Sequence, residues 1–279
     1  MMLLQAGQLG LYRKDSIWTS EIPPDMVAGV TMWVDGTDGE TLYAGESLDG
    51  GLATADGADI ESFENKVRAG FGFGIAGADK VRLKLSTTPN GQSAIDSPAG
   101  RNTVYQYLDM TGSGSAVVAM SSLLTTTNKL LIAALKLSSS VPFSNSVNAS
   151  ERVFADAQQN FGLLVSEDAG QVYVRGGNLN ASFIEAIVTQ PVTRSQFFVV
   201  TLSHQSNQLR LRVNGGAWAT QASSTTNVTF SSSPPQSVLS SGTVLELAHL
   251  ATFNTAQTAA AISAVEHWFA LDVGITPWW

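Results

Sequence analysis

The stretch Phe197-Phe198-Val199-Val200-Thr201-Leu202 begins the segment that decides the fold. Apolar residues fill both of its alternating faces, which is typical of a β-strand covered on two sides. A polar turn at 204–207 separates it from 208–213, where apolar residues alternate with polar and basic ones. That period of two predicts a strand with one exposed face. Asn214-Gly215 follows and predicts a tight hairpin, because both residues tolerate positive φ.

Two more elements complete this segment. Residues 244–253 predict a covered strand, since both faces are largely apolar. One face is expected to present Leu245, Leu247, Ala251 and Phe253, and the other Val244, Ala248 and Leu250. Thr258 is the expected N-cap of a helix that runs to about Asp272, with Gly274 as its C′ residue. The buried face of this helix is expected to carry Ile262, Val265 and Phe269.

Short strands separated by turn signals recur through the rest of the chain. They are expected at 30–35, 80–85, 103–110, 129–137, 161–165 and 171–175. The loop 166–170 is expected to join the last two as a hairpin. The run 72–77 matches G-x-G-x-x-G, but a strand pattern follows it where a nucleotide site needs a helix, so it predicts a glycine-rich turn. Together these patterns favour an all-β antiparallel sandwich with one C-terminal α-helix over a βαβ fold.

Five blocks of the sequence also carry a family resemblance. They are VTMWVD (30–35), ADIESFENK (58–66), FFVVTL (197–202), LAHLATFNTAQT (247–258) and VEHWFALDVG (265–274). In this order they resemble the concanavalin A-like, or laminin G-like, β-sandwich of the type found in bacteriophage structural proteins. The resemblance covers about residues 27–274 and is specific for the fold rather than for a ligand. It implies a concanavalin A-like jelly roll.

The same resemblance implies a role in a virus particle. It indicates a non-enzymatic structural or interaction protein of a bacteriophage tail, fibre or head decoration, located on the outer surface or tail of the virion. The implied partners are other virion proteins, copies of the chain in a homo-oligomer, and host cell-surface glycans. The alternative is a carbohydrate-binding module that has no virion role.

Composition narrows the function classes further. The chain has 279 residues, a formal net charge of −8, 14% charged residues and no cysteine. The negative charge and the lack of a basic cluster argue against nucleic acid as a partner. No apolar run approaches the roughly 18 residues of a membrane span, so no membrane insertion is expected. No basic residue precedes the short apolar start at 1–4, so no signal peptide is expected and the protein is expected to be made in the host cytoplasm.

The chain is expected to divide into an N-terminal arm at 1–25 and one sandwich domain at 26–279. Pro23-Pro24 ends the arm, whose apolar residues include Trp18. Two interpretations of the arm remain open. It is either an edge strand folded onto its own domain or a segment that docks on a neighbouring subunit, with Trp18 as the anchor.

The sequence carries few patterns typical of catalysis or metal binding. The sequence has no G-x-S-x-G elbow and no E-x-D-x-x-E strand, and Glu246 stands alone on its strand, so no enzymatic activity is expected. The three histidines, His204 in a turn, His249 on a strand and His267 on the helix, are expected to be structural or surface residues. No cofactor is expected. The acidic residues at 35–59 are expected to form a solvated loop surface, with calcium as the alternative.

Aromatic residues are the remaining candidates for contact with a partner or glycan. Trp33 and Trp268 fit core positions, and Tyr105 and Tyr107 lie on an expected strand. Trp218 follows the Asn214-Gly215 hairpin and is expected at the surface. Trp278 and Trp279 end the chain, where a free pair of indoles would be adhesive, so they are expected to pack against the domain or a partner. The predicted contact residues are therefore Trp18, Trp218, Trp278 and Trp279.

Overall fold

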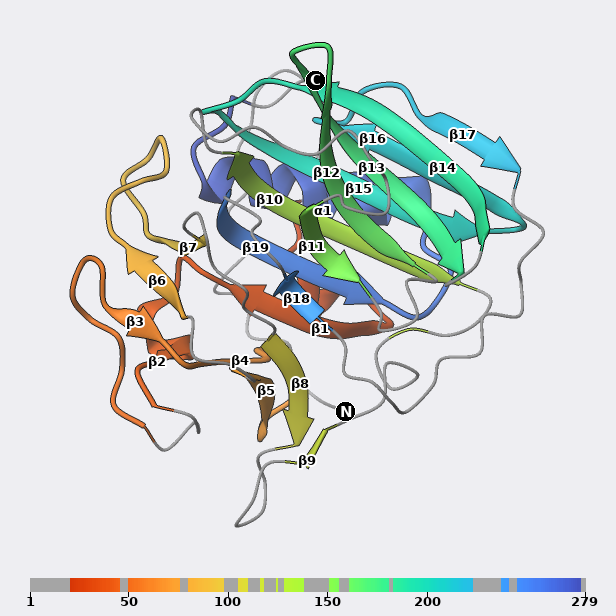
Figure 1. The fold of residues 1–279 in the computed structure, drawn as a ribbon. Helices are drawn as coiled ribbons and strands as arrows, with labels where there is room; N and C mark the ends of the chain where they lie inside the picture. Colours follow the sequence, from red (N-terminus) through yellow and green to blue (C-terminus); the bar gives the residue numbers. More distant parts are fainter. Residues whose placement is uncertain are drawn as a thin grey trace, which may run out of the picture.

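The computed structural model describes residues 21–45, 50–75, 80–97, 105–109, 116–117, 124, 128–137, 151–155, 161–180, 183–222, 237–240 and 245–276. Within these residues, two antiparallel sheets pack face to face and one α-helix lies on the outer face of one of them (Figure 1). The predicted all-β sandwich with one C-terminal helix is thereby confirmed.

We call the sheet that carries the helix the helix-side sheet. Its strands, in spatial order, are β17 (Ala219–Ala222), β16 (Gln208–Val213), β15 (Phe197–Gln205), β10 (Lys129–Leu137), β19 (Leu245–Phe253), β7 (Ala94–Ser97), β6 (Val81–Lys84) and β3 (Asp59–Ile60). Strand β1 (Val30–Asp35) also pairs with β19. The strands predicted around 197–213 and at 129–137 therefore lie side by side at the centre of this sheet.

The second layer is called the opposite sheet. Its strands, in spatial order, are β14 (Phe183–Val192), β13 (Gln171–Asn180), β12 (Gly162–Asp168), β11 (Glu151–Ala155), β18 (Ser237–Ser240), β8 (Tyr105–Asp109), β5 (Phe71–Ile75), β4 (Ser62–Glu64) and β2 (Leu42–Tyr43). Strand β9 (Ala116–Val117) pairs with β8. Two short 3₁₀ turns, η1 (Pro24–Met26) and η2 (Gly39–Thr41), flank β1 in the chain.

The central strands are apolar on both faces because each face meets a different core. Residues such as Leu131, Leu135 and Val200 fill the space between the two sheets. Their neighbours Ile132 and Val199 point the other way, into a second core beneath the helix. Every residue of β15 and β19 is buried. This two-sided cover explains why strict alternation is missing from 197–202 and from 129–137.

One face assignment was wrong because β19 contains a bulge. Its pairing with β10 shifts register between Ala134, opposite His249, and Leu135, opposite Leu247. The extra residue, Ala248, reverses which face the following side chains occupy. Leu245 and Leu247 therefore lie between the sheets, whereas Ala251 and Phe253 lie beneath the helix.

The C-terminal helix α1 (Ala259–Asp272) begins and ends where the sequence predicts. The Thr258 hydroxyl oxygen accepts a hydrogen bond from the Ala261 N–H at 3.1 Å, as an N-cap does. At the other end Gly274 has φ +79° and its N–H donates to the Leu271 carbonyl, while the Ile275 N–H donates to the Ala270 carbonyl. This pair of bonds is a Schellman motif, which favours glycine at that position. Ile262, Val265 and Phe269 pack onto the sheet as predicted.

Two turns differ from their predicted form. Strand β15 continues through His204 and Gln205, both buried, and the turn is only Ser206-Asn207. In the same way β12 runs to Asp168, and Ala169-Gly170 alone makes the hairpin. Both are two-residue turns with positive φ, which suit the twist of the flanking strands. The polar residues at the ends of β15 and β12 were therefore wrongly predicted as turn residues, and both strands are longer than predicted.

The glycine-rich run also differs from its prediction. Residues Phe71–Ile75 form the strand β5, which pairs with β4 and β8, and residues 76–79 lie outside the described part. Phe71 and Phe73 share one face and pack on the core, while the glycines alternate with them on the other face. The period of two in Phe-Gly-Phe-Gly is therefore a strand pattern rather than a turn.

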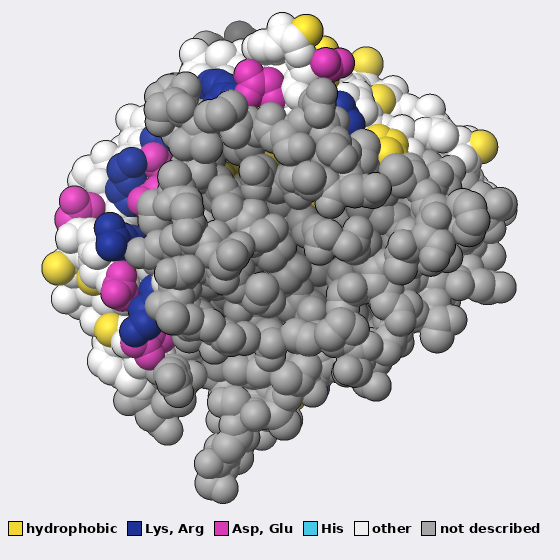
Figure 2. All heavy atoms as spheres, viewed as in Figure 1, with side chains coloured by type: hydrophobic (Ala, Val, Ile, Leu, Met, Phe, Trp, Pro, Cys, Tyr) yellow, Lys and Arg dark blue, Asp and Glu magenta, His cyan; other side chains and the backbone are white. Residues whose placement is uncertain are grey.

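Charged residues line the edge formed by β3 and β6. Lys80 pairs with Glu61, and Arg82 pairs with Asp59 at 3.4 Å. Figure 2 shows basic and acidic side chains interspersed along this edge of the molecule. Charges on a sheet edge discourage pairing with another strand.

Gly36, directly after β1, leads to a testable prediction about this end of the sheet. Its N–H donates to the Ala248 carbonyl at 2.6 Å, and a Cβ added there would lie 2.4 Å from the Leu247 carbonyl oxygen. We expect Gly36→Ala to lower the free energy of unfolding by about 1–3 kcal/mol, because backbone atoms on both sides must move apart. Urea denaturation measures the change.

Gly39→Ala is the matched control for this substitution. No atom lies within 4 Å of a Cβ added at Gly39, three residues further along the chain. We expect this variant to unfold close to the wild-type urea concentration. Equal destabilisation of the two variants would show that Gly36 is not tightly packed against the backbone of the β19 bulge.

Candidate functional site

Trp218 lies on the surface of the helix-side sheet, as predicted. Strands β16 and β17 pair with Leu211 opposite Ala219. Extending that register by one residue places Trp218 opposite Arg212 and diagonal to Arg210, on the face that points away from the opposite sheet. The centre of the Trp218 ring is 4.4 Å from the Arg212 guanidinium carbon and 5.2 Å from that of Arg210. The ring is half-buried, so part of it stays accessible.

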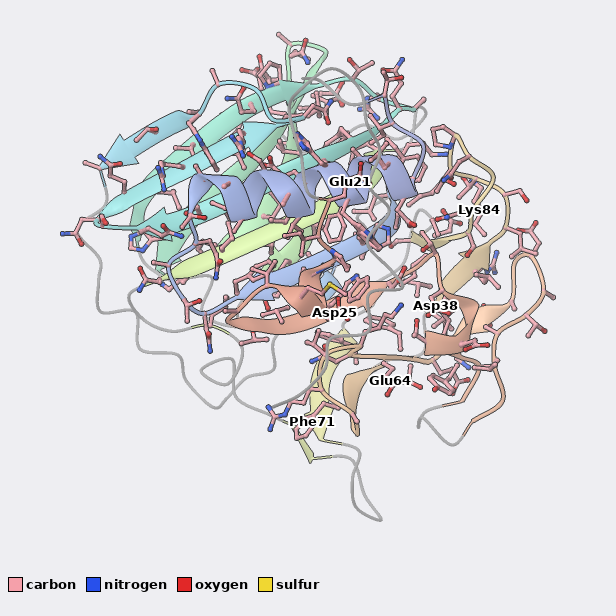
Figure 3. All side chains as sticks on the ribbon, turned by 180° about the vertical axis from the view of Figure 1, so that it is seen from behind. Glu21, Asp25, Asp38, Glu64, Phe71 and Lys84 are labelled. Carbon is pink, nitrogen blue, oxygen red and sulfur yellow. The ribbon has the colours of Figure 1, made fainter. Side chains whose placement is uncertain are left out.

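The helix leaves this edge of the sheet uncovered. Figure 3 shows α1 lying across the middle of the sheet, while the pale blue strand β17 lies outside the area that the helix covers. Helix α1 packs mainly on β10 and β15, and residues of β1, β7 and β19 complete the second core with them. We call Trp218, Arg210 and Arg212 the Trp218 surface.

Arg212 connects this surface to the helix. Its Nε donates to Glu266 Oε1 at 2.8 Å, and a terminal nitrogen donates to Glu266 Oε2 at 2.6 Å. The Thr201 hydroxyl also donates to Glu266. Burial raises the pKa of Glu266 above its usual value although Arg212 and Thr201 act in the opposite direction. The charge of Arg212 is therefore matched by a buried carboxylate, and its guanidinium is held in place beneath the Trp218 ring.

Arg210 differs from Arg212 in having no such partner. Apart from the Trp218 ring, no described residue makes a hydrogen bond or ion pair with it. Its Nε is buried and lacks an acceptor. A guanidinium carries five N–H donors in a planar fork and keeps its charge at all relevant pH values. The Trp218 surface thus combines an accessible aromatic ring with donors that are free to bind an acceptor.

A shallow pocket lies beside Val213 and Asn214, at the end of β16. It has a volume of about 200 Å³ and is lined in part by Gln171, Pro191, Gln196 and Asn214. The side-chain amides of two of these residues already form hydrogen bonds with backbone groups. Gln171 Nε2 donates to the carbonyls of Val172 and Val192, and Asn214 Oδ1 accepts from the Val199 N–H. These amide atoms are therefore already hydrogen-bonded within the fold.

A buried charged network connects the end of β1 with β19 and the helix C-terminus. His249 Nε2 lies 2.8 Å from Asp272 Oδ2, and His249 Nδ1 lies 3.3 Å from Asp35 Oδ1 but off the hydrogen-bonding direction. Lys66 Nζ lies 2.8 Å from Asp35 Oδ2. The Thr37 hydroxyl donates to Asp35 Oδ1 at 2.7 Å. These residues hold the helix end against the sheet.

The pKa values in this network follow from its charges. Burial alone would lower the pKa of His249, but Asp35 and Asp272 outweigh it and raise the pKa to about 9. Burial alone would raise the pKa of Asp35, yet His249 and Lys66 hold it well below its usual range. His249 is fully buried and Asp35 nearly so, which closes both to a ligand. The network is therefore structural.

This position of Asp35 corrects one sequence prediction. The acidic residues at 35–59 do not all form a solvated loop surface, because Asp35 ends β1 and is buried. Lys66 Nζ, which pairs with Asp35, also lies 2.9 Å from Asp38 Oδ2, so these two carboxylates share one cation. Asp49 lies outside the described residues. Among the described residues, no group of three or more His, Asp or Glu side chains is arranged to hold a metal ion.

The other candidate aromatics are in different surroundings. Trp33 is 5% exposed and meets Trp268 edge-on at 5.3 Å, which confirms the predicted core positions of these two residues. Trp18, Trp278 and Trp279 lie outside the described residues, as do the side chains of Tyr105 and Tyr107. Of the four predicted contact residues, the structure therefore places only Trp218.

The histidines and the basic residues show what sequence reasoning missed. His204 lies on β15 rather than in a turn, and all three histidines are buried. Lys84 and Lys136 both pair with Glu246, which the sequence pattern did not indicate. Arg210 was recognised only as part of an alternating strand. A Trp placed across a hairpin from two arginines is the sequence signal that could have identified it.

The chain is an antiparallel β-sandwich, and solved structures share this fold. A mutant of Trypanosoma rangeli sialidase with trans-sialidase activity is similar over 89% of this chain and 34% of its own, with a TM-score of 0.51 and 10% identity. Trypanosoma rangeli sialidase itself is similar over 94% and 36%, with a TM-score of 0.50 and 13% identity. The binding domain of botulinum neurotoxin serotype D is similar over 86% and 51%, with a TM-score of 0.51 and 11% identity.

These similarities concern the fold alone. The chain spans about a third of the sialidases and about half of the neurotoxin binding domain. No family model matches the sequence, and no curated protein matches it either. Within the described part of the chain, no helix has the length and apolar character of a membrane span.

The comparisons contradict the expectation that the chain has no enzymatic activity. That expectation was wrong, because proteins that contain this fold include sialidases and a trans-sialidase. A local motif joins only residues that lie close together in the sequence. The sandwich also brings together residues from distant segments, as it does for Asp35 and Asp272 around His249. Missing local motifs therefore do not exclude catalysis on such a fold.

Proposed function

We propose that this chain is a carbohydrate-binding β-sandwich and that the Trp218 surface is its glycan contact. The observation that carries the proposal is the accessible Trp218 ring beside the unpaired guanidinium of Arg210. Aromatic rings provide a rigid apolar surface on which a sugar ring can pack, and nearby donors fix its orientation. The fold shared with sialidases supports a glycan as the ligand.

A bacteriophage virion is the proposed setting. The resemblance of the five sequence blocks to phage structural proteins supports it. The low content of charged residues, 14%, also suits a chain that packs against copies of itself and other virion proteins. The arm 1–25, with Trp18, and the terminal Trp278 and Trp279 are the proposed segments for those contacts.

The glycan contact is tested with Trp218→Ala. We expect glycan-array screening of the wild type to find ligands, and Trp218→Ala to weaken binding by about tenfold or more, because the packing surface is removed. Trp218→Phe is expected to retain part of the affinity. Leu271→Ala removes an exposed apolar side chain from α1 and serves as the control. Unchanged binding in Trp218→Ala would contradict the proposed site.

The virion setting has a separate test. Mass spectrometry of purified phage particles is expected to find the chain in multiple copies, and light scattering is expected to give the mass of a symmetric oligomer. A monomer that is missing from the particles would overturn the virion proposal and leave the glycan contact standing.

A further inference from the structure

We infer that the sugar recognised by the Trp218 surface carries a carboxylate, and that Arg210 binds this group. This inference rests on the proposed glycan contact and specifies its ligand class. The sugar ring would pack on the accessible part of Trp218. Its carboxylate would accept hydrogen bonds from the guanidinium of Arg210 beside that ring.

The first support is the contrast between Arg210 and other basic residues. Several of them are matched by a carboxylate from the chain itself, namely Lys66, Lys80, Arg82, Lys84, Lys136, Arg194 and Arg212. Arg210 has no such match among the residues that the structure describes, and its buried Nε–H has no acceptor there. Its terminal nitrogens are not buried and have no acceptor among the described residues, so they can donate to an incoming carboxylate.

The second support is preorganisation. The indole of Trp218 lies over both guanidinium groups, and Arg212 is fixed by Glu266 on the helix. Stacking on an aromatic face limits the orientations that a guanidinium can adopt. A planar fork already held in place loses less entropy when it binds a carboxylate through two parallel hydrogen bonds. The geometry therefore favours a planar carboxylate over a neutral hydroxyl.

The overall charge limits the kind of acidic ligand. The chain has a formal net charge of −8, and Arg212 is already neutralised by Glu266. A polyanion such as a heavily sulfated glycan needs clustered positive charge, which one arginine does not supply. A sugar with one carboxylate, such as a sialic or a uronic acid, needs only a single cation.

The test compares acidic sugars with neutral counterparts of the same shape. Isothermal titration calorimetry would compare the affinity for N-acetylneuraminic acid with that for its methyl ester. It would also compare the affinity for glucuronic acid with that for glucose. We expect the wild type to bind at least one acid about ten to a hundred times more tightly than its neutral counterpart, as charge-assisted bidentate hydrogen bonds would give. The two pairs distinguish a sialic acid from a uronic acid.

Arg210→Gln is the decisive variant, and Arg175→Gln is its matched control. Arg175 on β13 is also half-buried with an unpaired Nε, but no described aromatic ring lies beside it. We expect Arg210→Gln to abolish the preference for the acid and Arg175→Gln to leave it unchanged. Arg210→Lys keeps the charge without the fork and is expected to retain part of the preference. Circular dichroism would confirm that each variant is folded.

The outcomes separate this inference from the proposed function. Equal affinity of the wild type for acid and neutral sugars, with binding still lost in Trp218→Ala, would overturn the role of Arg210 and keep the glycan contact. An acid preference that survives in Arg210→Gln would overturn it as well. Failure of the wild type to bind any sugar of the panel or the array would overturn both.

Discussion

Replacing His249 with glutamine is expected to remove most of the pH dependence of stability between pH 6.5 and 9. In the wild type, the free energy of unfolding is expected to fall by about 3 kcal/mol across this range, because one pKa unit corresponds to about 1.4 kcal/mol. The range runs from the ordinary pKa of histidine, 6.5, to the value of about 9 in the folded protein.

The sign follows from which state binds the proton more tightly. The folded protein holds a proton on His249 more tightly than the unfolded chain does, since Asp35 and Asp272 surround the imidazole. The resulting stabilisation is complete below pH 6.5 and is lost as the pH rises through 9. Asp35 acts in the opposite sense, because its lowered pKa provides stability that is lost as the pH falls below 3.8. Maximum stability is therefore expected between these two limits.

Urea denaturation at a series of pH values measures this effect. His267→Gln is the control, because burial and Arg212 lower the pKa of His267, and its titration falls below pH 6.5. The control variant is expected to keep the wild-type decline between pH 6.5 and 9. A wild-type profile that is flat over that range would show that His249 is not charged in the folded protein.

The sequence predicted those parts of the fold whose signal is local. Strand β10 fills its whole apolar run, and helix α1 lies between a Thr cap and a Gly stop that both act within one turn of the backbone. The bulge at Ala248 was not predictable, because it exists only through the pairing of β19 with β10. The same applies to the length of β15, whose polar end is buried by its neighbours in the sheet.

The candidate site divides in the same way. Trp218 was found because a hairpin signal places it at the surface. The importance of Arg210 depends on which residues lie across the hairpin and on which basic residues already have a carboxylate, and both are tertiary facts. The network around His249 joins β1, β19 and α1, so no spacing in the sequence indicates it.

The largest expected loss of stability comes from the ion pair that supports the Trp218 surface. Arg212 and Glu266 are 11% and 1% exposed, and no other described cation pairs with this carboxylate. We expect Arg212→Met to lower the free energy of unfolding by about 3–5 kcal/mol, because it leaves a buried charge without its partner. Urea denaturation of the folded variants at neutral pH measures the loss.

The double variant Arg212→Met/Glu266→Leu is the control, and it is expected to recover most of that stability. Both charges are then replaced by apolar groups of similar size, so no buried charge remains. Acid provides a second signature. Burial already raises the pKa of Glu266, and without Arg212 it would rise further, so Arg212→Met should regain stability as the carboxylate takes up a proton. The contrary outcome is that the stability losses of the two single substitutions simply add in the double variant, and that acid restores no stability to Arg212→Met. The helix would then be held to β16 by packing alone, and Trp218 would not depend on the ion pair for its position.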